Sequence, residues 1–216
     1  MKKTGIFLLM LSAALSLAAC SQGAASSNES ESAASTAAAA ETSAEASESS
    51  EAASAEPGSH TLIAYFSWSG NTERVASLIQ QETGGDLFEI APATPYTDDY
   101  DALLDQAQAE QAEDARPELA AQVENWQDYD VVFVGYPNWW SDAPMAVYTF
   151  LESYDFTGKT LIPFNTSASG GFGRSLSGLE ESAAGAVMLD GLAITEGELD
   201  NAEQMVSDWI GTLNLD

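Results

Sequence analysis

The sequence predicts an α/β fold in which a parallel β-sheet is covered by helices on both faces. Short apolar runs bounded by turn residues recur at Thr61–Phe66, Asp130–Gly135 and Thr160–Phe164. Runs of this length are typical of strands that are buried on both faces. Segments with helical patterns separate them, and a regular alternation of strands and helices requires crossover connections and therefore parallel strands.

Two further segments complete the predicted sheet. Gly85–Ile90 mixes charged and apolar residues, which favours an edge strand, and Ala186–Ile194 is expected to supply a fifth strand. The first helical segment carries Val75, Leu78 and Ile79 on one face. The other predicted helices are Tyr100–Ala115, Pro144–Leu151, Leu176–Ala184 and Leu199–Leu213.

The N-terminal residues 1–20 have the pattern of an export signal. Lys2 and Lys3 precede an apolar stretch over Gly5–Ala19 that is short for a membrane span. The stretch ends in LAAC, and Cys20 is the only cysteine of the chain. This ending resembles the lipobox of bacterial lipoproteins, which implies cleavage before Cys20, a lipid on its sulfur, and anchoring on the extracytoplasmic side of the cell membrane. The alternative is an ordinary signal peptide with a chance cysteine.

Residues 21–59 have the composition of a disordered tether. They include 13 Ala, 12 Ser and seven Glu, with no Lys, no Arg and no large apolar residue to bury. An alanine-driven helix is the alternative, but the many serines and the missing hydrophobic face disfavour it.

Residues 60–216 are long enough for one domain with its own core, and this domain is strongly acidic. Its 27 Asp and Glu residues face only Arg74, Arg116, Lys159 and Arg174, which gives a formal net charge of −23. Binding to nucleic acid relies on clustered Lys and Arg, so the composition excludes that class of partner.

The loops that follow the buried strands are the places to look for a ligand site, because ligands of parallel sheets bind beyond the carboxyl ends of the strands. These loops read SWSGNT (67–72), YPNWWSDAP (136–144) and NTSASGGFG (165–173). In the first, Ser67, Ser69 and Thr72 offer hydroxyls, and a helix that begins at Asn71 or Thr72 points its free amides into the loop. This predicts an anion site that needs no lysine, although a plain helix cap and tight turn explains the same residues equally well.

The sequence lacks the residues that several other kinds of functional site require. The chain has no G-x-x-x-x-G-K-[ST] motif and no G-x-G-x-x-G after the first strand. A Ser-His-Asp hydrolase needs a histidine, and the single one, His60, lies at the linker junction. Transition-metal ligation lacks cysteine and histidine. Asp98, Asp99 and Asp101 lack the glycine spacing of an EF-hand, which favours a solvated helix start over a calcium site.

The three loops together resemble those of flavodoxins. S-W-S-G-N-T is similar to their phosphate-binding [ST]-x-[ST]-G-x-T loop, Y-P-N-W-W resembles the aromatic third-strand loop of flavodoxin-like quinone reductases, and T-S-A-S-G-G resembles the fourth-strand loop that borders the flavin. The resemblance covers residues 60–216. It implies a three-layer sandwich with a five-stranded parallel sheet in the order 2-1-3-4-5, and FMN as the cofactor.

Transferred to this chain, the resemblance implies three sets of FMN-binding residues. The phosphate set is Ser67, Trp68, Ser69, Gly70, Asn71 and Thr72. The ring set is Pro137, Asn138, Trp139 and Trp140, of which we expect only one tryptophan to touch the flavin. The backbone amides of Thr166, Ser167, Ala168, Ser169 and Gly170 would line the ring edge. Tyr96 and Tyr100 are candidates either for covering the ring or for plain packing.

The predicted function is that of an FMN-binding electron-transfer protein or oxidoreductase, lipid-anchored outside the cytoplasmic membrane, with a redox protein or a quinone-like molecule as its partner. Two alternatives stay open at this stage. One is an NAD(P)H-dependent quinone-type or azo reductase. The other is a surface lipoprotein that keeps the fold without catalysis, because fold alone does not determine function.

Overall fold

The computed structural model describes residues 60–213 and 215, so the predicted signal peptide, Cys20 and the tether lie outside the described residues. All strands of the sheet are parallel and follow the order β2-β1-β3-β4-β5, with β6 also paired to β4. This confirms the predicted order and the edge position of β2. The strands are β1 (Thr61–Tyr65), β2 (Asp86–Glu89), β3 (Val131–Pro137), β4 (Thr160–Ser167), β5 (Val187–Met188) and β6 (Leu192–Thr195).

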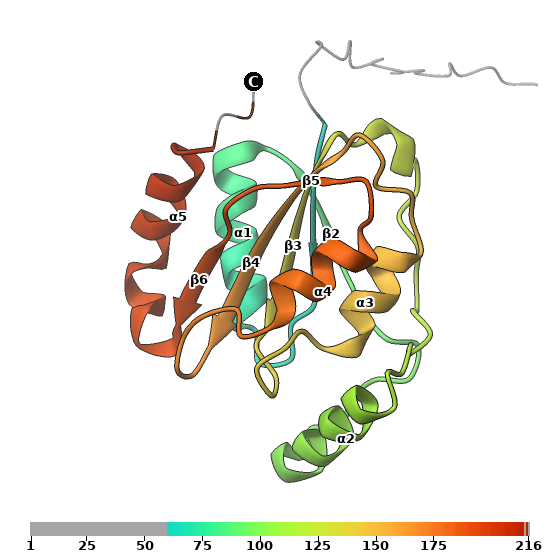
Figure 1. Cartoon of the computed structure of the whole chain (residues 1–216). Helices are drawn as coiled ribbons and strands as arrows, with labels where there is room; N and C mark the ends of the chain where they lie inside the picture. Colours follow the sequence, from blue (N-terminus) through green and yellow to red (C-terminus); the bar gives the residue numbers. More distant parts are fainter. Residues whose placement is uncertain (1–59, 214, 216) are drawn as a thin grey trace, which may run out of the picture. The chain divides into compact units, whose positions relative to one another are not determined.

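Helices cover both faces of the sheet, as Figure 1 shows. The helices of the described residues are α1 (Asn71–Thr83), α2 (Tyr100–Ala112), α3 (Met145–Glu152), α4 (Ser175–Ser182) and α5 (Ala202–Ile210), with 3-10 turns at Trp126–Asp128 and Glu196–Asn201. In the part of the chain from residue 60 to 213, none of them is long and apolar enough to cross a membrane.

Two separate cores lie on the two faces of the sheet. On one face, α1 and α5 bury side chains such as Ile79 and Val206 against Ile63 and Phe133. On the other face, α3 and α4 pack onto the side chains that alternate with these along the strands, such as Val132. The alternation follows from the period-two geometry of a strand, and each fully buried aliphatic side chain stabilises the fold by about 1.5–3 kcal/mol.

The predicted fifth strand, Ala186–Ile194, is divided into β5 and β6. Val187 N–H donates to Lys159 O at 2.9 Å and Leu189 N–H donates to Leu161 O at 3.0 Å. The next bond of this parallel ladder would need an N–H from residue 163, which is a proline. The ladder therefore breaks there and resumes when Phe164 pairs with Leu192.

Strands β3 and β4 run further than predicted, which shortens the loops after them. Pro137 pairs with Thr166 as the last rung between the two strands, and Asn138 N–H then donates to Thr166 O at 2.8 Å. Pro137, Thr166 and Ser167 therefore belong to strands rather than to loops. Strand pairing gives these residues a firmer backbone than a loop would.

Helix α2 differs from the others, because it lies beyond the carboxyl ends of the strands rather than against a face of the sheet (Figure 1). Asp99 caps its start by accepting from Ala102 N–H at 2.9 Å. It ends before the predicted Ala115, where Asp114 takes a positive φ of 50° and turns the chain. Its position makes it a wall of the site described below.

Candidate functional site

A cavity of about 410 Å³ lies at the carboxyl ends of the strands. This volume falls in the range of small-molecule sites. Ten of the fifteen residues predicted to bind a cofactor line it: Trp68, Ser69, Asn71, Pro137, Asn138, Trp139, Trp140, Thr166, Ser167 and Ala168. The remaining lining residues are Tyr100, Leu103, Leu104 and Ala107 of α2, together with Glu196.

The loop after β1 ends at the start of α1 in a backbone conformation that requires glycine. Gly70 has φ +84°, and a Cβ there would meet no atom within 4 Å, so the requirement concerns backbone direction rather than space. Gly70 provides no side-chain cap, and Ser67 Oγ accepts from Glu73 N–H at 3.2 Å instead. The first amides of α1 have no helical acceptor, and the helix dipole makes this end partly positive, which suits an anion.

Thr72 differs from the rest of this loop, because its side chain is buried against β4. Its side chain is 1% exposed, and its hydroxyl lies 2.9 Å from the hydroxyl of Thr166. The hydroxyl is therefore turned to β4 rather than into the cavity. Ser67 and Gly70 support the loop without lining the cavity.

Trp68 connects the first loop to α2. Its indole N–H donates to Thr97 O at 3.0 Å, and its ring lies 6.1 Å from that of Tyr100, centroid to centroid. Trp68 thereby holds the start of α2 against the loop and gives the cavity an aromatic wall on this side. The resemblance places Trp68 in the phosphate set, and its contacts with Thr97 and Tyr100 were not predicted.

The two neighbouring tryptophans of the third loop sit in a tight two-residue turn. Trp139 N–H donates to Asp142 O at 2.9 Å and Asp142 N–H donates to Trp139 O at 3.0 Å, while Trp140 and Ser141 have φ of 52° and 63°. Turns of this kind prefer Asn-Gly, because both central residues need positive φ. Trp139 packs edge-on against Phe66 at 5.3 Å, whereas Trp140 is 46% exposed.

The fourth loop is held by side chains of the strand ends. Ser167 Oγ accepts from Gly170 N–H at 2.7 Å, and the side-chain amides of Asn138 and Asn165 both donate to Gly171 O at 2.8 Å. These bonds bring the loop beside the third one. Ser169 and Gly170, predicted at the ring edge, do not line the cavity.

Comparison with known proteins assigns the family of the domain. The sequence profile of the flavodoxin family matches residues 60–213. The chain belongs to the flavodoxin family. Among curated proteins, none matches the chain significantly.

Solved structures of other flavodoxin-like proteins agree with this assignment. A protein from Bacteroides eggerthii, assigned as a flavoprotein, is 34% identical with a TM-score of 0.65, and the match covers 74% of this chain and 100% of that one. A similarly assigned protein from Bacteroides uniformis is 33% identical with a TM-score of 0.64, covering 72% and 99%. A flavoprotein of Lactobacillus acidophilus, solved in complex with FMN, is 26% identical with a TM-score of 0.54, covering 67% and 98%. This flavodoxin-like fold is consistent with an FMN-dependent redox function.

In this flavodoxin-family domain, several wall residues were missed by sequence reasoning. Leu103, Leu104 and Ala107 belong to α2, whose apolar residues look like an ordinary core stripe in the sequence. Glu196 follows β6 and gives no motif of its own. Of the two candidate covering residues, Tyr100 lines the cavity and is 61% exposed, whereas Tyr96 donates from its hydroxyl to Glu110 Oε2 at 2.6 Å.

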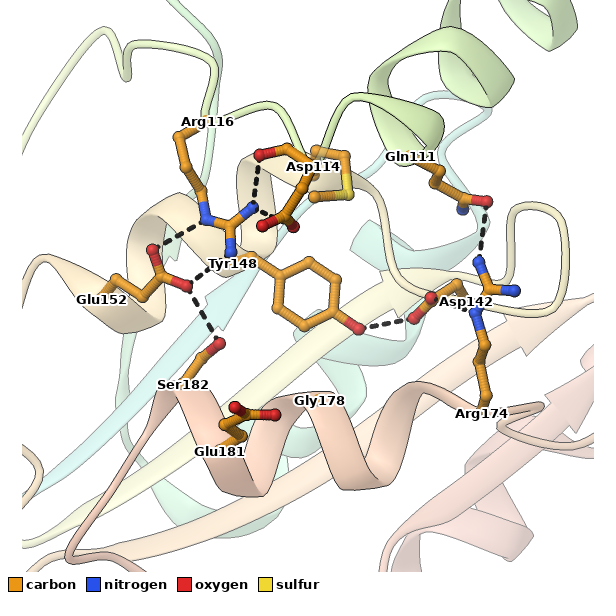
Figure 2. A pocket seen from close by; sticks show the side chains of 11 residues that line it. Gln111, Asp114, Arg116, Asp142, Tyr148, Glu152, Arg174, Gly178, Glu181 and Ser182 are labelled. Atoms are coloured by element: carbon orange, nitrogen blue, oxygen red, sulfur yellow. Dashed lines mark hydrogen bonds and ion pairs between the residues drawn. The ribbon is translucent and has the colours of Figure 1, made fainter.

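A second, polar cavity of about 380 Å³ lies behind the third loop and is shown in Figure 2. Arg116 pairs there with Glu152 and Asp114, each at 2.7 Å, and Arg174 pairs with Asp142 at 2.6 Å. The hydrogen bonds from Arg116 lower the pKa of Glu152. Burial raises the pKa of Tyr148 well above its usual range, so its hydroxyl stays protonated and donates to Asp142.

Within residues 60–213, no group of three or more His, Cys, Asp or Glu side chains is placed to hold a metal ion. The larger cavity is lined by amides, hydroxyls, aromatic rings and the carboxylate of Glu196.

Proposed function

We propose that this chain binds FMN in the 410 Å³ cavity and acts as an electron-transfer protein or an oxidoreductase. The observation that carries the proposal is the meeting of an open helix N-terminus at Asn71 with the tryptophan turn at one cavity. An anion-binding end next to an aromatic wall is what a phosphorylated planar cofactor requires. The FMN complex of the flavoprotein from Lactobacillus acidophilus, a relative at 26% identity, supports the same cofactor.

The residues fit FMN at both ends. The first amides of α1, with Ser69 and Asn71, would hold the phosphate, so no lysine is needed. Trp140 and Pro137 would contact the ring, and the backbone amides that follow Thr166 would bond its polar rim. When bound, FMN supplies the redox chemistry by taking up and releasing electrons, while the chain binds and orients it.

The charge of the domain would act on the cofactor. With a formal net charge of −23 over residues 60–216, the protein disfavours a further negative charge on reduced flavin. Glu196 contributes one of these charges at the cavity itself. We therefore expect a low reduction potential.

A redox protein or a quinone-like molecule is the proposed partner, rather than NADPH. Among the four basic residues of the described domain, Arg116 and Arg174 are held in ion pairs and Lys159 is buried. Only Arg74 is exposed without such a pairing, which is not the cluster that a dinucleotide phosphate requires. Anaerobic mixing of the FMN-loaded protein with NADPH should leave the flavin oxidised, and rapid bleaching would favour the reductase alternative.

We further propose that Cys20 carries a lipid that anchors the protein outside the cytoplasmic membrane. The proposal rests on the LAAC ending of the signal and on the long tether after it. In a bacterial host, Cys20→Ala should move the protein from the membrane fraction to the soluble fraction. Membrane association that persists in this variant would contradict a lipid anchor at Cys20.

The central experiment compares FMN with riboflavin, which lacks the phosphate, for binding to the purified full chain. Hydrogen bonds to a charged group contribute about 1.5–3 kcal/mol each, so two of them should make FMN bind on the order of 100-fold more tightly. Flavin fluorescence quenching reports both dissociation constants. Ser69→Ala should reduce this preference, whereas Ser207→Ala on α5, outside the cavity, should not. Absence of FMN binding by the native chain would favour the non-catalytic alternative.

A further inference from the structure

We propose that Arg174, Gln111 and Asp142 form a clamp that positions the Trp139–Trp140 turn at the flavin cavity. None of the three clamp residues lines that cavity; all of them line the polar cavity behind it (Figure 2). They are positioning residues, because they act on the flavin site only through the turn. The inference rests on the proposed FMN function, but the clamp itself can be tested without FMN.

The turn needs support because its backbone is strained. Trp140 and Ser141 both have positive φ, and such a conformation costs a residue with a side chain on the order of 1 kcal/mol or more. The end of the fourth loop packs against the turn, where Arg174 N–H donates to Ser141 O at 2.9 Å. A Cβ at Gly173 would lie 2.2 Å from Ser141 O, so the two loops pack with no room between them.

The clamp is a closed ring of hydrogen bonds. Gln111 donates from Nε2 to Trp139 O at 2.8 Å, and its Oε1 accepts from Arg174 Nη2 at 3.2 Å. Arg174 donates from Nε to Asp142 Oδ2 at 2.6 Å, and Asp142 N–H returns to Trp139 O at 3.0 Å. The ring joins α2, the N-cap residue of α4 and the turn, which are far apart in the sequence, and Figure 2 shows the three clamp side chains together.

Asp142 is the residue of the ring that is held by hydrogen bonds from several elements. The residue is 9% exposed, and its second carboxylate oxygen accepts from Ala143 N–H at 2.8 Å and from the hydroxyl of Tyr148 on α3. Both oxygens are therefore engaged by donors from different elements. Hydrogen bonds to an ionised group are stronger than neutral ones, so this carboxylate holds its end of the turn firmly.

A separate hydrogen bond, beside the clamp, joins the turn to the α2 wall of the cavity. Trp140 donates from its indole N–H to Leu104 O on α2 at 3.0 Å. Leu104 lines the flavin cavity, as Trp140 does. When the ring opens, this bond alone is left to hold Trp140 at α2 beside the turn's own backbone bonds, so the tryptophan should be positioned less firmly in the cavity.

The test compares the variant Arg174→Gln with Arg116→Gln, which is the matched control. Arg116 lies in the same polar cavity and pairs with Glu152 and Asp114, but it makes no bond to the turn. Both variants remove one positive charge. We expect Arg174→Gln to weaken FMN binding by the full chain about tenfold and to alter the visible circular dichroism of the bound flavin, whereas Arg116→Gln should change the affinity by less than about twofold.

Hydrogen exchange of the FMN-free chain separates this inference from the proposed function. The amides of Trp139 and Asp142 bond across the turn, so Arg174→Gln should speed up their exchange and Arg116→Gln should not. If the native chain binds no FMN, the proposed function is wrong. The amide exchange rates of the FMN-free variants still show whether the clamp holds the turn. Equal exchange in the two variants would overturn the clamp.

A third variant, Gln111→Leu, tests the clamp without a change of charge. It removes both bonds of Gln111 in the ring, and residue 111 lies near the end of α2, where the substitution disturbs no core. We expect faster exchange at Trp139 and weaker FMN binding, in the same direction as for Arg174→Gln. Native behaviour of Gln111→Leu would assign the Arg174 effect to charge alone and would contradict the clamp.

Discussion

The hydroxyls of Thr72 and Thr166 lie 2.9 Å apart, and both side chains are buried. Thr72 is in the first turn of α1, and Thr166 is next to the end of β4, 94 residues away. Each hydroxyl is therefore the hydrogen-bond partner of the other. The bond fixes the first loop relative to the fourth, and these loops form two sides of the cavity proposed to bind FMN.

Thr72→Val should lower the free energy of unfolding by about 1–3 kcal/mol, because it leaves the buried Thr166 hydroxyl without its partner. Replacing both threonines by valine should cost less than the sum of the two single changes, because no polar group then stays buried and unpaired. Urea unfolding of the four proteins in this double-mutant cycle measures the coupling. Strictly additive losses would show that the two hydroxyls do not interact.

Trp68→Phe should loosen the start of α2, because it removes the indole N–H that bonds Thr97 O at 3.0 Å. We expect faster amide exchange in the first turn of α2 and FMN binding weakened about three- to tenfold, as for the loss of one hydrogen bond. Trp209→Phe is the matched control, because its indole N–H also bonds a backbone carbonyl, Asp190 O at 3.0 Å, but on α5. Equal effects of the two changes on FMN affinity would contradict the role of Trp68.

Glu196→Gln should raise the reduction potential of the bound flavin, because it removes a negative charge from the cavity wall. A unit charge at this range shifts a potential on the order of tens of millivolts, as measured by anaerobic titration with a redox dye. Glu203→Gln on α5 makes the same change of charge outside the cavity and is the control. A shift as large in Glu203→Gln would mean that net charge alone sets the potential.

The ion pair of Arg116 and Glu152 should make stability depend on acid pH. Hydrogen bonds from Arg116 lower the pKa of Glu152 in the folded protein below its ordinary 4.5. This contribution to stability is therefore complete above about pH 4.5 and is lost as the pH falls through the lowered pKa. Glu152→Gln should be less stable than the native chain at pH 7, and urea unfolding at a series of pH values should show the difference shrinking below pH 4.5. A difference that is independent of pH would contradict the ion pair.

The order of the elements and the identity of the site loops were predictable from the sequence, because both depend on local patterns. Buried strands such as Asp130–Gly135 have an apolar run of the right length, and a parallel sheet places the residues after them at one edge. The hydroxyl-rich loop before α1 follows from the same reasoning. The predicted signal, lipidation at Cys20 and the tether stay predictions.

Long-range contacts decided what local patterns could not. That Thr72 turns to Thr166, that Trp68 bonds Thr97 O, and that the α2 wall around Leu104 closes the cavity all depend on partners at least 29 residues apart. The split of the fifth strand falls opposite Pro163 of its neighbour, which has no N–H for the next bond of the ladder. Trp68 therefore shows the limit best: the sequence places it in the loop, and only the packing of α2 against that loop gives its indole a partner.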